Sequence, residues 1–327
     1  NTNAYGIELA DYGHPKVDEG LPQYNLAYAV NQKDSTPLFY ELYDGSVIDN
    51  TELEIMLEEA KEFGHEKLGV LMDRGYISEK NIKALRTKGY EYILMMKQNQ
   101  RICQEIIEEY GAAVQSLEGY YIGEHGVYGT TVKKQLYGQE TNIHVYYDDI
   151  RASEEKVALM SRYETWEKEI EKKVEKKLAT EGEMKKYRKV FKLKYDQNGY
   201  LVAYQRNSRY IKEEIRNLGF FFIMTSEDMS ASKALDIYRG RDNIEKMFRS
   251  LKSGIDFNKA RVHTTESLKS KVFVTFIAMI VRNELFQKAE ELRKKNRKAY
   301  TVPGMISELE NIECTRNSVG KYRRKYA

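Results

Sequence analysis

The sequence predicts an α/β fold, because short apolar runs typical of strands alternate with stretches whose apolar residues recur at helical spacing. Leu53, Met56, Leu57 and Ala60 have that helical spacing, and Ser78 is a suitable N-cap for a second helix. The first hundred residues are therefore expected to form strands at 21–30 and 37–43, a helix at 49–63, a strand at 67–73, a helix from 78 to 88 and a strand at 90–96.

Residues 98–217 interrupt this order and predict an insertion into the α/β domain. Its expected elements are Tyr-rich strands near 120, at 130–137 and at 143–147, a Lys- and Glu-rich helix at 153–178, and strands at 190–195 and 200–205. Met160, Tyr163, Ile170 and Val174 share one face of the expected helix.

The α/β pattern returns after the insertion, with an apolar strand at 219–224 and an apolar helix at 267–285 that is expected to cover the sheet. The predicted organisation is a first core part at 1–97, the insertion at 98–217, a second core part at 218–290 and a basic C-terminal segment at 291–327.

Charge and composition narrow the functional classes only slightly. The chain has 327 residues, and its 53 basic residues nearly balance its 50 acidic ones. Basic residues are frequent at 168–216 and 321–325, which fits either phosphate contact or a solvated surface. No apolar run approaches the ~18 residues that span a bilayer. Two isolated cysteines argue against a disulfide framework and indicate a reducing cytoplasm.

The most informative segment is 238–252, which places Tyr238, Arg241, Glu245 and Lys252 at relative positions 0, 3, 7 and 14. In a continuous helix these side chains fall within about 60° of one another, beside a separate apolar stripe. The spacing predicts a helix that packs on a core and presents one carboxylate among two cations and a phenol. An ordinary amphipathic helix with an Arg241–Glu245 ion pair also explains it. Gly240 inside such a helix costs about 1 kcal/mol relative to Ala.

The pattern Tyr-x2-Arg-x3-Glu-x6-Lys resembles the signature of one group of DDE transposases, the insertion-sequence enzymes of the IS-four-like superfamily. All four positions are filled here. Other blocks resemble the same family in the same order: residues 12–23, Asp44-Gly45-Ser46 followed by Asp49, and residues 71–81, which include Asp73. The resemblance covers most of residues 5–285, with the insertion poorly matched.

This resemblance implies a ribonuclease H-like fold, in which a mixed sheet flanked by helices is interrupted by a mostly β insertion, here with one long helix. It implies that Asp73 and Glu245 are catalytic and bind metal, and that Tyr238, Arg241 and Lys252 contact DNA. The implied cofactors are two Mg²⁺ ions, with Mn²⁺ as a substitute. From the residues alone, Asp73 also fits a turn, Tyr238 a core position and Lys252 a plain surface lysine.

The family's first catalytic Asp lies on its first strand, shortly before the stretch that matches residues 5–16. Asp11 falls too late to serve. We therefore expect the sequence to be an excerpt from which this strand has been cut, and to be inactive by itself.

The implied function is metal-dependent cleavage and strand transfer of DNA at insertion-sequence ends. The implied partners are transposon ends and target DNA, bound by a homodimer in a paired-end complex near the nucleoid of a bacterial or archaeal cell. Two alternatives stay open at this stage. One is a transposase remnant that binds DNA without cutting it, and the other is a ribonuclease H-like nuclease without strand transfer.

Overall fold

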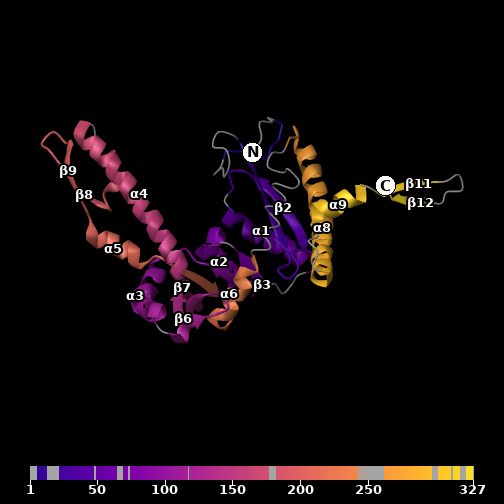
Figure 1. Ribbon diagram of the computed structural model, residues 1–327, viewed down its shortest axis with the longest axis horizontal. Coiled ribbons are helices and arrows are strands. Elements are labelled where there is room, and N and C mark those ends of the chain that lie inside the picture. The colour runs from indigo at the N-terminus through magenta and orange to yellow at the C-terminus, as the bar shows by residue number, and fades with distance from the viewer. Residues whose placement is uncertain are drawn as a thin grey trace. The chain divides into compact units, whose positions relative to one another are not determined.

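The chain forms two compact units in the computed structural model (Figure 1). The terminal unit combines Asn1–Glu66 with Arg239–Ala327, and the central unit is Lys67–Tyr238. The structure describes residues 6–12, 22–47, 49–64, 69–72, 74–116, 118–176, 182–241, 245, 261–296, 301–310, 312–316 and 322–326.

A curled mixed sheet of six strands forms the core of the central unit. The strands are β3 (Gly69–Met72), β4 (Glu91–Met95), β5 (Tyr121–Ile122), β6 (Val127–Leu136), β7 (Gln139–Tyr147) and β10 (Phe220–Thr225). Their order is β3-β4-β10-β7-β6-β5. β3 and β4 are parallel, and the other neighbouring pairs are antiparallel.

Helices cover both faces of this sheet. They are α2 (Glu79–Thr87), α3 (Arg101–Ser116) and α6 (Ala231–Arg239). Side chains alternate along β10, so Phe221 and Ile223 pack with Leu235 of α6. Phe220 meets α3 on the other face, where a Cβ on Gly111 would lie 3.2 Å from its ring. This mixed α/β architecture confirms the predicted fold class and is compatible with a ribonuclease H-like fold.

A smaller body, here called the α4–α5 subdomain, lies outside the six-stranded sheet. It contains α4 (Asp149–Lys176), the hairpin of β8 (Phe191–Tyr195) and β9 (Leu201–Arg206), and α5 (Ser208–Arg216). It has its own core, in which Tyr163 and Ile170 of α4 pack with Phe191 and Leu201 of the hairpin. The apolar face predicted for this helix is therefore confirmed.

Strands β5 to β7 fall within residues 98–217, the segment expected to be an insertion, yet they hydrogen-bond into the main sheet. The apolar alternation of β7 explains this pairing, because Ile143 and Val145 are fully buried. The four-part division of the chain stays a prediction, and the compact units divide the chain at different residues.

The terminal unit is built on an antiparallel hairpin and one long helix. Its elements are β1 (Tyr24–Val30), β2 (Pro37–Asp44), α1 (Asp49–Glu62), α8 (Thr265–Asn296), α9 (Val302–Glu310), β11 (Ile312–Arg316) and β12 (Tyr322–Tyr326). Leu268 and Val272 of α8 are buried against the β1–β2 hairpin. The Phe276 ring lies 5.1 Å from the ring of Tyr40. None of the described helices is long and apolar enough to cross a membrane.

Most of the expected elements are present with ends within a few residues of those expected, the helix expected at 238–252 excepted, and the differences are informative. Helices α3 and α5 were not predicted, although Cys103, Ile106, Ile107 and Val114 of α3 are buried at helical spacing. The expected helix at 267–285 is present and longer. It is buried along one side only, since the side chain of Phe273 is 55% exposed.

A buried histidine connects three strands of the main sheet. Thr225 Oγ1 donates to the carbonyl of Glu227, so it accepts a hydrogen bond from Nε2 of His144 at 3.0 Å. The Thr131 hydroxyl then donates to Nδ1 of His144 at 2.8 Å. Burial lowers the pKa of His144 to about 4, so its imidazole is neutral near pH 7 and Nδ1 can accept this hydrogen bond.

We expect the protein to lose stability as the pH falls from about 6.5 toward 4. In that range the unfolded chain protonates His144 and the folded chain does not, because its folded pKa lies near 4. Between about pH 7 and pH 5 the loss is on the order of 2 kcal/mol. Urea unfolding at both values measures it. His144→Gln should reduce the change in the free energy of unfolding between the two pH values. An unchanged difference would show that His144 does not cause the loss of stability.

Candidate active site

The first expected site residue, Asp73, follows β3 directly and lies outside the described residues. β3 runs parallel to β4 up to Met72, which is paired with Leu94 and buried. A 3₁₀ turn, Arg74–Tyr76, comes after Asp73. In the sequence, Asp73 therefore stands between strand β3, whose last residue is buried, and a defined turn.

The turn after Asp73 is fixed by side chains of α2 and its N-cap. Ser78 Oγ accepts a hydrogen bond from the backbone N–H of Asn81 at 3.2 Å, which caps the helix as predicted. The side-chain amide of Asn81 donates to the carbonyl of Tyr76 at 2.9 Å. Asn81 is 1% exposed, and Ile82 beside it is fully buried. These contacts hold the backbone that follows Asp73.

Helix α6, which precedes the other expected carboxylate, is fastened to the sheet at its first turns. Ser230 Oγ accepts from the N–H of Lys233 at 3.2 Å and caps the helix. The hydroxyl of the buried Tyr146 donates to the carbonyl of Ala231 at 2.7 Å. His125 Nε2 lies 2.5 Å from a carboxylate oxygen of Asp236, which ties α6 to the turn between β5 and β6.

Tyr238 is a core residue of the central unit. Its side chain is 7% exposed and packs with Val127, Phe221 and Leu235. α6 ends at Arg239, and Gly240 lies in a turn. The single continuous helix expected through 238–252 is therefore interrupted at Gly240, consistent with the low helix propensity of glycine. The common stripe calculated for a continuous helix does not carry over from Tyr238 to Glu245.

Arg241 and Glu245, which belong to the terminal unit, are brought together by the structure. Both are helical, and the Arg241 guanidinium donates to Oε1 of Glu245. The Arg241 side chain is 22% exposed and the Glu245 side chain 52% exposed. The ion pair expected from their four-residue spacing is therefore present. It leaves the carboxylate accessible from solvent.

The chemistry of Glu245 suits a divalent metal, since Mg²⁺ binds accessible carboxylate oxygens and retains several waters. Within the described ranges no group of three or more His, Cys, Asp or Glu residues could hold a metal ion. Asp73 and Lys252 both lie outside those ranges. Of the two metal-ligand candidates, Glu245 is the one that the structure describes, together with its contact to Arg241.

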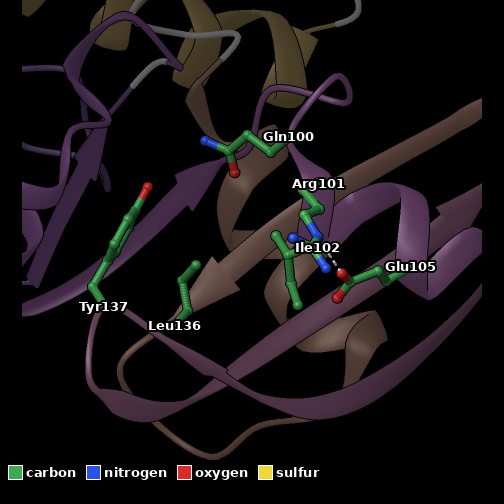
Figure 2. Close-up of a pocket in the computed structure, with 6 residues that line it drawn as sticks. All are labelled: Gln100, Arg101, Ile102, Glu105, Leu136 and Tyr137. Carbon is green, nitrogen blue, oxygen red and sulfur yellow. Dashed lines mark hydrogen bonds and ion pairs between the residues drawn. The ribbon is translucent and has the colours of Figure 1, made fainter.

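A shallow hollow with a volume of about 350 Å³ lies elsewhere in the central unit (Figure 2). Its walls come from the start of α3 and from Leu136 and Tyr137 at the β6–β7 turn. Arg101 pairs there with Glu105 at 2.8 Å, and burial raises the pKa of Tyr137. None of the expected site residues lines this hollow.

The sequence analysis did not identify the residues that hold the turn after Asp73 and helix α6 in place. Asn81 could have been noticed, because it lies on the otherwise apolar face formed by Ile82 and Leu85. The His125–Asp236 pair joins residues 111 positions apart, and spacing along the chain gives no signal for such a contact.

Replacing Asn81 with Ala should lower the free energy of unfolding by about 1–2 kcal/mol, because the buried side chain of Asn81 is lost together with its partly buried hydrogen bond to the carbonyl of Tyr76. Glu79→Gln on the same helix is the control. It breaks the exposed Glu79–Lys83 pair and should cost less than about 0.5 kcal/mol. Denaturant unfolding compares the two variants. Equal losses would show that Asn81 does not fix this turn.

The comparison with known proteins gives the family. The family described as "Transposase DDE domain" matches residues 6–281, which include Asp73, Glu245 and the α4–α5 subdomain. Among the curated proteins searched, none matches the chain. A match over most of the sequence, together with the mixed sheet flanked by helices, is decisive. The chain belongs to the DDE transposase family.

Proposed function

We propose that this transposase cuts DNA at the ends of an insertion sequence and joins the released strands to target DNA. The observation that carries the proposal is the family match over residues 6–281, which contain both expected carboxylates. The accessible carboxylate of Glu245 and the cation beside it support the assignment. Asp73, which follows strand β3 directly in the sequence, is the second carboxylate of the proposed site.

The proposed site binds two divalent ions, Mg²⁺ with Mn²⁺ as a substitute, through Asp73 and Glu245. Such ions would activate the attacking oxygen and stabilise the leaving oxygen of a phosphodiester. Glu245 is accessible enough to bind a cation, and its present partner is the Arg241 guanidinium. In the proposed complex a DNA phosphate competes with Glu245 for Arg241, since guanidinium binds phosphate in bidentate fashion.

Tyr238, Arg241 and Lys252 are the proposed DNA contacts. The buried ring of Tyr238 favours a hydrogen bond from its hydroxyl to phosphate over stacking on a base. Lys252 would act as a point charge near the cleaved bond. Transposon ends and target DNA are the proposed partners. A homodimer on paired ends, in the cytoplasm close to the nucleoid, is part of the same proposal.

In the protein as its gene encodes it, Glu245→Gln should abolish Mg²⁺-dependent strand cleavage and leave DNA binding largely intact. The amide removes one anionic metal ligand and keeps the size of the side chain. Cleavage of labelled transposon ends and a binding titration measure the two properties. Glu284→Gln, at an exposed position of α8, is the control and should cut normally. Cleavage by Glu245→Gln at the wild-type rate would rule out metal binding by Glu245.

Arg241→Gln and Lys252→Gln should each weaken end binding and reduce the salt slope of the binding constant by about 0.9, since each removes one phosphate contact. Fluorescence titration over a range of salt concentrations gives the slope. If neither variant changes it, the two cations do not contact the DNA backbone.

A further inference from the structure

Positive charge is concentrated in one part of the α4–α5 subdomain. Residues 182–217, which contain the β8–β9 hairpin and α5, have ten basic and four acidic residues, a net charge of +6. Helix α4 has seven basic and eight acidic residues, a net charge of −1. The chain as a whole carries only +3. The excess positive charge therefore belongs to the hairpin and α5, and not to the long helix.

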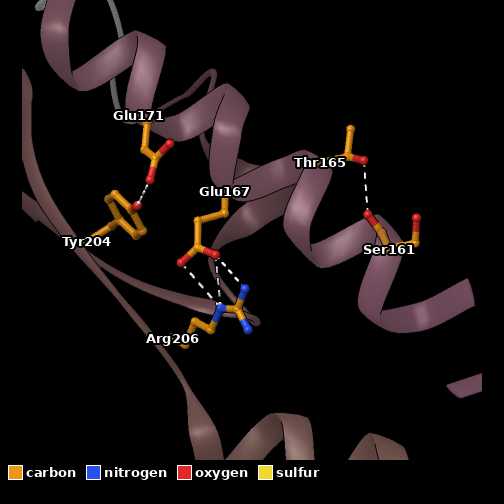
Figure 3. Close-up of polar contacts among 6 residues, drawn as sticks. All are labelled: Ser161, Thr165, Glu167, Glu171, Tyr204 and Arg206. Carbon is orange, nitrogen blue, oxygen red and sulfur yellow. Dashed lines mark hydrogen bonds and ion pairs between the residues drawn. The ribbon is translucent and has the colours of Figure 1, made fainter. Parts of the chain in front are cut away.

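The cations of this segment that face α4 are neutralised within the subdomain (Figure 3). Arg206 of β9 donates from Nε to both carboxylate oxygens of Glu167, at 3.2 and 3.1 Å. Lys186 pairs with Glu169 at 3.1 Å. The Tyr204 hydroxyl donates to Glu171 at 2.8 Å. The carboxylates of α4 thus hold the hairpin in place and neutralise the positive charges of Arg206 and Lys186.

The opposite face of the hairpin keeps its cations. Phe191, Leu193 and Tyr195 point toward the subdomain core, so Lys192 and Lys194 of β8 point outward and are exposed. They pair across the hairpin with Gln205 and Ala203 of β9. In the described part of the chain neither lysine forms an ion pair. This outer face, defined by Lys192, Lys194, Ala203 and Gln205, contains no carboxylate.

The nearest acidic residue on the hairpin is Asp196, and its carboxylate is turned to the tip. One of its oxygens accepts hydrogen bonds from the N–H groups of Asn198 and Tyr200, both at 2.9 Å. These bonds stabilise the turn, where Gly199 has φ +81°. Asp196 therefore serves the turn and does not neutralise the two lysines of the outer face.

We propose that the outer face of the β8–β9 hairpin binds the phosphate backbone of the DNA on which the transposase acts. The proposal rests on the proposed function, which supplies DNA as the substrate. Lys192 and Lys194 lie about 7 Å apart on one strand face, and each side chain is long and flexible enough to reach a different phosphate of the same DNA strand. The pair can therefore follow the backbone, and Gln205 adds an amide donor beside it.

The hairpin is a firm support for such a contact. Phe191 and Leu201 are fully buried, and α4 holds the hairpin through Arg206 and Glu167. Two lysines fixed to a packed hairpin lose less freedom on binding than lysines of a mobile loop. A backbone contact of this kind carries no sequence information, so it adds affinity and orientation for any DNA sequence.

The test is the salt dependence of binding to a short DNA duplex of random sequence, measured with the protein as its gene encodes it. Lys192→Gln/Lys194→Gln should reduce the salt slope of the binding constant by about 1.8, because two phosphate contacts are lost. Lys192→Arg/Lys194→Arg keeps both charges and should retain the wild-type slope. The matched control is Lys168→Gln/Lys172→Gln, which removes two exposed lysines from α4 and should leave the slope unchanged.

The outcomes separate this inference from the proposed function. Wild-type binding with the same slope in the Lys192→Gln/Lys194→Gln variant overturns the hairpin site and leaves the transposase assignment standing. A wild-type protein that binds no DNA at all contradicts the proposed function itself. The same variant is also tested with an RNA duplex and with phosphatidylserine vesicles. Tighter wild-type binding to either ligand, lost in the variant, would replace DNA as the partner.

Discussion

Strand β10 is the constraint on which the central unit depends. All six of its side chains are buried, and it forms ladders with β4 on one edge and with β7 on the other. It thereby joins the parallel pair β3–β4 to the antiparallel strands β7, β6 and β5. Because both edges are used, a shift of β10 by one residue would turn Phe221 and Ile223 away from α6 and break both ladders.

The same strand links the α4–α5 subdomain to the expected catalytic residues. The chain leaves α5, enters β10 and turns into α6, whose first turns are fastened to the sheet by Tyr146 and His125. Asp73 follows β3 in that sheet, whereas Arg241 and Glu245 come after the turn at Gly240. In the sequence, one expected carboxylate thus follows a strand of the sheet directly, and the other follows helix α6, which packs on β10.

Most of the fold could be predicted, because the apolar patterns of β10 and α4 match their burial, whereas the apolar run of α8 indicated the helix and overstated how much of it is buried. The pairing of β7 with β10, through which β6 and β5 join the sheet, was not predictable, since it brings together residues about eighty positions apart, such as His144 and Thr225. The break at Gly240 illustrates another limit of sequence patterns. Residue spacing shows which side chains would share a face only if the helix is continuous, and a glycine can interrupt the helix. For the candidate site, the motif predicted the Arg241–Glu245 contact, whereas burial of Tyr238 depended on packing against Phe221.

We propose that Asp73 and Glu245 bind the same divalent ions at the reacting phosphate. A crystal structure of the protein with a transposon-end duplex and Mn²⁺ tests it most directly, because anomalous scattering locates the metal. Metal peaks are expected within about 2.0–2.2 Å of oxygens from both carboxylates and beside a phosphate of the DNA. Metal bound at other residues, with Glu245 still paired only to Arg241, would contradict it.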